Sequence, residues 1–187
     1  MMIMRKVIAF FFYAVFGFAL FNWIGWPLEF RFEDSHRNYF FIAGLCSLLP
    51  ILLFIKVIMS NIDSKLLLAS LSSICLSFFC LIVGYFAYSD GLKAYERGTD
   101  GSFEVIDEVT FEGFNYKLYR TNGGATTSYG LVLREEYQLA FGVKAVGRIF
   151  EKYKASDARI YLDGSILVLV IQPYSQDESV QTVSLKI

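Results

Sequence analysis

Histidine and cysteine are almost missing from this chain. The single histidine, His36, and the three cysteines, at positions 46, 75 and 80, all lie within the first 89 residues. The C-terminal half therefore lacks the side chains for Ser-His or Cys-His nucleophile pairs and for the common zinc sites. The cysteines all fall in apolar stretches, where a thiol behaves as a small hydrophobic group. We predict no metal, no cofactor and no catalytic residue.

Charge is scarce in the first half of the chain. Residues 1–89 hold six Lys or Arg and four acids, whereas residues 90–187 hold eleven basic and fourteen acidic residues, a formal net charge of −3. The C-terminal half contains no basic run. A mildly acidic domain without one argues against nucleic acid as a partner.

Long uncharged runs occupy the charge-poor half. A bilayer core of about 30 Å needs roughly 20 helical residues, and three segments are that long and apolar. They predict membrane-spanning helices at about 7–28, 39–59 and 66–89, so the lipid bilayer is one expected partner. Aromatic residues of the kind found at membrane interfaces flank them: Trp23, Trp26, Tyr39, Tyr85 and Tyr88.

The first segment also has features of a cleaved signal peptide. Arg5 and Lys6 precede it, and Gly17-Phe18-Ala19 resembles a cleavage site. The apolar run continues as far as Trp26, which a signal peptide does not need, so a retained span is favoured.

Basic residues in short loops predict the orientation. Arg5 and Lys6 precede the first span, and Lys56 and Lys65 bracket the short loop between the second and third. Because cytoplasmic loops are enriched in Lys and Arg, we expect a cytoplasmic N-terminus. Three spans then place the C-terminal domain outside the cytoplasm, in the periplasm or at the cell exterior.

The third span carries a stripe of small residues and no mid-membrane charge. Small side chains let helices approach closely. Such a face either packs the three helices together, which is favoured, or docks another membrane protein. Ion and proton pathways usually need charged groups inside the membrane, so a conduit is not expected. The stripe consists of Ser70, Ser73, Ser77, Cys80 and Gly84.

The rest of the chain alternates between polar and apolar residues. We expect a linker at 90–101, rich in turn signals, and an α+β domain at 102–187. Alternation predicts an antiparallel sheet of five or six strands, including an edge strand over 180–187. One segment has helical spacing and predicts an amphipathic helix of about four turns, with apolar residues at Val143, Val146, Ile149, Phe150 and Tyr153.

One loop within this domain could bind an anion. Paired glycines with nearby hydroxyls can form a backbone nest, although a plain hairpin loop explains the same residues and is favoured. It is not a P-loop, because the spacing and the following helix are missing. The candidate binding residues are Arg120, Asn122, Gly123, Gly124, Thr126, Thr127 and Tyr129.

Gly124-Ala125-Thr126-Thr127, between two strands, resembles the signature of a family of small bacterial membrane-anchored proteins. The resemblance covers roughly residues 114–172. In that family a cysteine often precedes the signature, and Gly123 stands there in this chain, which removes any thiol chemistry. The resemblance implies a bacterial envelope protein, and no agreed activity comes with it.

These observations favour a non-enzymatic protein of the bacterial inner membrane. Its external domain would bind another protein, for example as an immunity protein against a toxin. A subunit or scaffold of a larger envelope complex is an alternative. A third is an envelope enzyme that uses carboxylates or the Gly-Gly-Ala-Thr-Thr loop.

Overall fold

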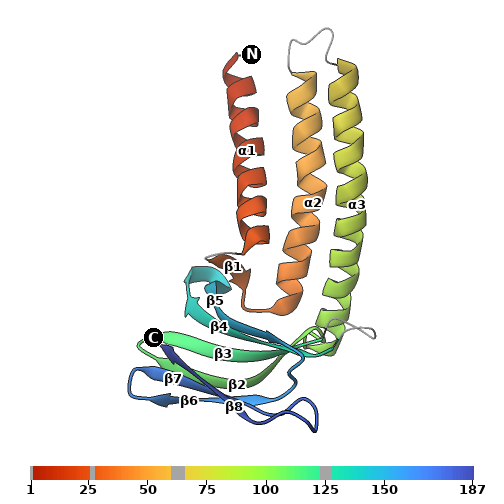
Figure 1. Ribbon diagram of the computed structural model, residues 1–187. Coiled ribbons are helices and arrows are strands. Elements are labelled where there is room, and N and C mark those ends of the chain that lie inside the picture. Colours follow the sequence, from red (N-terminus) through yellow and green to blue (C-terminus); the bar gives the residue numbers. More distant parts are fainter. Residues whose placement is uncertain (1, 26–27, 60–65, 123–127) are drawn as a thin grey trace. The chain divides into compact units, whose positions relative to one another are not determined.

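The computed structural model describes residues 2–25, 28–59, 66–122 and 128–187. In these residues the chain forms two compact units (Figure 1). One unit comprises Met1–Ile24 and Asp34–Arg97 and holds helices α1 (Met2–Ile24), α2 (Ser35–Ile58) and α3 (Leu66–Arg97). The other comprises Gly25–Glu33 and Gly98–Ile187 and holds every strand of the described chain.

The three helices are long and apolar enough to cross a membrane. Their most apolar windows have mean hydropathies of 2.1, 2.5 and 1.9. Helices of soluble proteins seldom stay apolar on every face over such a length. The prediction of three membrane-spanning helices is confirmed, and the chain is a multi-pass membrane protein.

Glycines on α3 allow it to pack closely along α2. A Cβ atom added at Gly84 would lie 3.1 Å from the Cβ of Cys46, and one added at Gly91 would lie 2.9 Å from Cε1 of Phe40. Real side chains seldom come this close, so a larger residue at Gly84 would press on Cys46, and one at Gly91 would displace the Phe40 ring. Helix α1 packs on α2.

Helix α3 continues through most of the predicted linker. The linker was expected at 90–101, but the helix runs without a break to Arg97. Gly91, within the predicted linker, instead provides the close approach to Phe40. Lys93 pairs with Asp90 one turn earlier, at 3.0 Å. The helix ends where Gly98 takes a left-handed φ of +69°, the usual role of a glycine after a helix.

The described strands form two antiparallel sheets. The first has five strands in the order β1 (Glu29–Phe32), β5 (Val143–Tyr153), β4 (Gly130–Gln138), β3 (Phe114–Thr121) and β2 (Phe103–Phe111). The second has three, in the order β6 (Ala158–Asp163), β7 (Ile166–Ile171) and β8 (Gln181–Lys186). A short 3₁₀ helix, η1 (Ala140–Gly142), joins β4 to β5.

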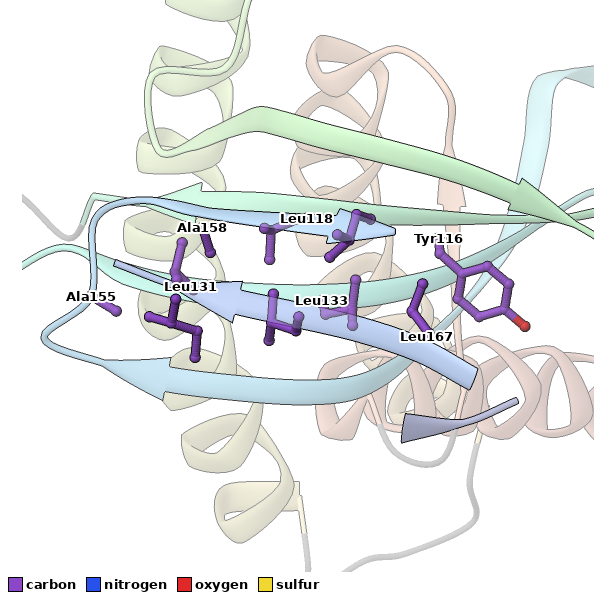
Figure 2. Packing of buried hydrophobic residues seen from close by; sticks show 10 residues of the cluster. Tyr116, Leu118, Leu131, Leu133, Ala155, Ala158 and Leu167 are labelled. Carbon is purple, nitrogen blue, oxygen red and sulfur yellow. The ribbon is translucent and has the colours of Figure 1, made fainter. Parts of the chain in front are cut away.

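The two sheets pack face to face around one core. Figure 2 shows Leu118 and Leu133 of the first sheet and Leu167 of the second directed into the space between the sheets. All three are completely buried. On one side the sheets are joined where Asp107 of β2 accepts a hydrogen bond from the backbone N–H of Ile160 in β6, at 2.9 Å. The predicted antiparallel domain is confirmed, as two sheets rather than one.

The segment predicted as an amphipathic helix is strand β5, so that prediction is wrong. The register between β5 and β4 shifts by one residue, because Leu133 pairs with Phe150 and Arg134 with Arg148, which leaves Ile149 as a bulge. A bulge reverses which face the following side chains point to. Val146 and Phe150 therefore point to opposite faces of the sheet, although their four-residue spacing would place them on one face of a helix.

Strand β1 was not expected, because its residues lie in the connection between the first two spans. Glu29–Phe32 pairs antiparallel with Val143–Val146 of β5. The connection between α1 and α2 is thus part of the same sheet as the C-terminal domain. Its alternation of charged and aromatic residues, Glu29-Phe30-Arg31-Phe32, is the period-two pattern of a strand.

The pairing of β1 with β5 predicts a cross-strand disulfide between Phe30→Cys and Ala145→Cys. The N–H of Glu33 donates to the carbonyl of Gly142, so 30 and 145 form a non-hydrogen-bonded pair, with Cα atoms about 4.5 Å apart. That separation suits a disulfide. In a background without native cysteines, mild oxidation should remove both thiols, as measured by a maleimide gel shift.

The matched control pairs Phe30→Cys with Val143→Cys, a diagonal neighbour about 7–8 Å away that should crosslink slowly. Equal crosslinking of both pairs would contradict the register.

Candidate functional site

The structure describes three of the seven candidate binding residues. Gly123, Gly124, Thr126 and Thr127 lie outside the described residues. Arg120 is the penultimate residue of strand β3. Its Nη2 lies 2.6 Å from Oε2 of Glu104, and its guanidinium lies 5.6 Å from the centre of the Tyr129 ring. The hydrogen bond to Glu104 raises the pKa of Arg120. Its charge, which an anion site would use, is thus already paired.

Asn122 and Tyr129 hold the two ends of this connection through backbone bonds. The N–H of Asn122 donates to the carbonyl of Ser102 at 3.1 Å, and the carbonyl of Tyr129 accepts from the N–H of Ala155 at 3.1 Å. The Tyr129 side chain is 42 % exposed. The described residues at these two ends therefore brace neighbouring strands.

The small-residue stripe of α3 lies partly against α2. Ser73 and Cys80 are buried, Ser77 and Gly84 are half-buried, and Ser70 is exposed. The buried face continues beyond the stripe through Ala87, Gly91 and Ala94. Most of the stripe thus contributes to packing between helices of the same chain.

A set of buried charges that the sequence did not reveal lies on the five-stranded sheet, on the face opposite the core. Its centre is Glu136 of β4, which is only 2 % exposed. Its Oε2 accepts a hydrogen bond from Nζ of Lys144 at 2.7 Å, and its Oε1 accepts one from the hydroxyl of Tyr119 at 2.6 Å. One carboxylate thereby links strands β3, β4 and β5.

A second buried carboxylate, Glu29, connects β1 to the same face. Nε of Arg31 lies 2.7 Å from Oε1 of Glu29, and Nη2 of Arg134 lies 3.7 Å from the same oxygen. The Arg134 guanidinium also lies 4.6 Å from the centre of the Phe103 ring in β2. We call Glu29, Arg31, Arg134, Glu136, Lys144 and Tyr119 the buried charge network, which with the Phe103 ring reaches all five strands.

Burial dominates the electrostatics of this network. It raises the pKa of Tyr119, helped by the hydrogen bond to Glu136 and its charge. Burial and the charge of Arg31 lower the pKa of Arg134 to about 10, so Arg134 remains a cation at neutral pH. Nε of Arg134 is buried without a hydrogen-bond partner among the described residues. The network has three cations and two carboxylates.

The network is better suited to holding strands together than to acid–base chemistry. Glu136 is bonded to both Lys144 and Tyr119, and a carboxylate so occupied and buried offers no free oxygen to a substrate. The described residues contain no group of three or more His, Cys, Asp or Glu placed to hold a metal ion. Sequence reasoning missed these residues because charged side chains on a strand normally face solvent.

Tyr119→Phe should lower the free energy of unfolding at neutral pH by about 1.5–3 kcal/mol, because the Tyr119 hydroxyl donates to a charged partner. The folded state keeps the Tyr119 proton above pH ~10, where the unfolded chain releases it. This stabilisation is therefore complete below pH ~10 and is lost as the pH rises further. The difference in the free energy of unfolding between wild type and variant should therefore narrow above pH ~10. Urea unfolding of the full chain in detergent measures it.

Arg134, whose pKa is lowered, makes a contribution of opposite sign in both proteins, so only its coupling to the charge of Tyr119 remains in the difference. Tyr161→Phe, at a tyrosine that is 50 % exposed, is the matched control and should change little. A wild-type-to-variant difference that stayed constant to pH 11 would show that the Tyr119 hydroxyl is not held as described.

Comparison with known proteins identifies no relative of this chain. No protein-family model, no curated protein and no solved structure matches the chain. The resemblance carried by Gly124–Thr127 stays a prediction.

Proposed function

We propose that this chain is a non-enzymatic protein of the bacterial inner membrane whose C-terminal domain binds a protein partner by strand addition. The observation that carries the proposal is the open edge of strand β8. Backbone groups at an open strand edge can pair with a strand from another protein.

The backbone pairing of β8 identifies which groups are available. The N–H of Ile187 donates to the carbonyl of Ser165, so Leu185, Val183 and Gln181 follow as the residues hydrogen-bonded to β7. Thr182, Ser184 and Lys186 then turn their N–H and C=O groups away from β7. In the described residues no strand pairs with β8 on that side.

The other sheet edges are less suited to strand addition. Strand β2 is bulged at Ile106, and its Asp107 accepts a hydrogen bond from the N–H of Ile160 on the outer edge of β6, so the edges of β2 and β6 are already engaged with each other. Strand β1 has only four residues. Strand β8 has six, and Lys186 is its only charged residue, so it carries little of the charge that usually protects an edge.

The pairing of β1 supports the proposed orientation. Residues 25–33 and 98–187 belong to one unit, which requires both segments to be on the same side of the membrane. The two spans between these segments, α2 and α3, return the chain to the same side, which meets that requirement. The opposite side then receives the N-terminus with Arg5 and Lys6, which favours the cytoplasm for that side. The domain would face the periplasm or the cell exterior.

Within this proposal the most concrete partner is a toxin that acts on the membrane or in the periplasm. An immunity protein needs only a binding surface and a membrane anchor, which fits a sandwich with an open edge and buried, paired charges. Co-expression of such a toxin tests this finer proposal, because the chain should then protect cells.

A second candidate is a permanent subunit of a larger envelope complex. A groove of about 910 Å³ between α2 and α3 favours it, with small residues such as Gly44 and Ser47 in its lining. A Cβ atom added at Gly44 would meet nothing within 4 Å, so this part of the helix surface is open. Gly44→Leu should fill the groove and release such a subunit, leaving binding at β8 unchanged.

Ser184→Pro should abolish partner binding at β8. Proline removes an N–H that points away from β7, so the hydrogen bonds between β7 and β8 stay intact. The added strand loses one hydrogen bond and clashes with the proline ring. We expect capture of the partner from native membranes to fall about tenfold or more, which corresponds to about 1.4 kcal/mol, measured by quantitative mass spectrometry.

Ser184→Ala keeps the N–H and is the matched control, with capture equal to wild type. Equal capture by the proline variant would rule out β8 as the binding edge.

Labelling with a membrane-impermeant maleimide tests the orientation. In a background without native cysteines, Tyr161→Cys in β6 should react in intact spheroplasts, because it is half-exposed on the proposed external domain. Lys6→Cys, before the first apolar run, should react only after lysis. The reverse pattern would place the domain in the cytoplasm.

A further inference from the structure

The hairpin tip between β4 and β5 presents apolar side chains to its surroundings. Phe141, in η1, is 96 % exposed, Leu139 is 42 % exposed and Tyr137 is 47 % exposed. We call residues 137–142 the β4–β5 tip. An aromatic side chain exposed so completely adds nothing to the core of the domain, and clustered exposed apolar groups mark interaction surfaces.

The backbone of the tip makes phenylalanine an unexpected choice. Phe141 has φ 61° and ψ 28°, in the left-handed region that glycine and asparagine adopt easily and bulky residues rarely do. The hairpin closes through a bond from the N–H of Leu139 to the carbonyl of Val143, at 2.8 Å, which does not use the Phe141 ring. Strained residues of this kind tend to be retained at functional positions.

The β4–β5 tip is hydrogen-bonded to Glu33, which lies just before α2. The N–H of Glu33 donates to the carbonyl of Gly142 at 2.9 Å, and α2 begins two residues later, at Ser35. Two residues span at most about 7 Å, and the four helical steps from Ser35 to Tyr39, where the apolar run of α2 begins, add about 6 Å. The chain itself thus holds the β4–β5 tip near the surface of the membrane that α2 crosses.

We propose that the β4–β5 tip inserts into the interfacial layer of this membrane, with Phe141 as the inserted side chain. Aromatic residues favour the headgroup level of a bilayer, where an apolar ring leaves water without reaching the acyl core. Lipid is the chosen occupant because the tip is tied to a membrane-entering segment. The β8 edge plays no part in the inference, so either proposal can fail without the other.

A fluorescent probe on the tip tests the insertion. The full chain, with its native cysteines replaced, carries Phe141→Cys labelled with an environment-sensitive nitrobenzoxadiazole dye and is reconstituted in pure phosphatidylcholine vesicles. Emission should shift to the blue and be quenched by nitroxide-bearing lipid. The matched control is Tyr161→Cys, on the outer face of β6, which should show neither effect.

A second pair of variants keeps the labelled residue constant. A probe at Leu139→Cys should be quenched when Phe141 is present and lose most of that quenching with Phe141→Asn, since asparagine tolerates the left-handed backbone but lacks the apolar ring. Absence of quenching at position 141, or equal quenching at 141 and 161, would overturn the proposal. A blue shift that occurs only in native membranes, and not in pure lipid, would assign the tip to a protein partner and would also overturn it.

Discussion

The pairing of β1 with β5 is the constraint on which the rest of this structure depends. It takes the segment between two membrane helices and makes it an edge strand of the sheet in the C-terminal domain. The domain is therefore attached to the membrane helices by three covalent connections, before β1, after β1 and after α3, where the sequence alone indicated one. The same pairing brings the β4–β5 tip to Glu33 and requires both segments of the sandwich to be on one side of the membrane.

The buried charge network gives this pairing its specificity. Moving charges out of water costs several kcal/mol per ion in proteins, and an ion pair repays this only with good geometry, so such a network seldom adds much net stability. Removing one member is different, because it leaves a buried charge without its partner. Glu29 reaches Arg134, and Glu136 reaches Lys144 and Tyr119, so a β1 shifted by one residue would turn Glu29 away from Arg134. The network thereby favours one register.

The buried polar groups of the domain differ from the groups that we propose for binding. The titratable side chains with the most strongly shifted pKa values, Tyr119 and Arg134, are buried in contacts with other strands. The groups that we propose for binding are instead the backbone amides along β8 and the apolar side chains at the β4–β5 tip. Such groups can pair with an added strand or enter a lipid surface, as we propose.

The sequence by itself determined the three membrane helices, the antiparallel character of the domain and the edge strand β8, because length, apolar content and period-two alternation are local properties. It also placed Ser73, Ser77, Cys80 and Gly84 on one helix face. Only the tertiary structure showed that Glu29–Phe32 forms a strand, since a four-residue strand is recognisable only when its partner β5 is known. The same holds for β5, where the bulge at Ile149 lets apolar residues recur at helical spacing within a strand. The charges of the network come together only because five strands from distant parts of the chain pair in one sheet. No spacing of residues in the sequence predicts that arrangement.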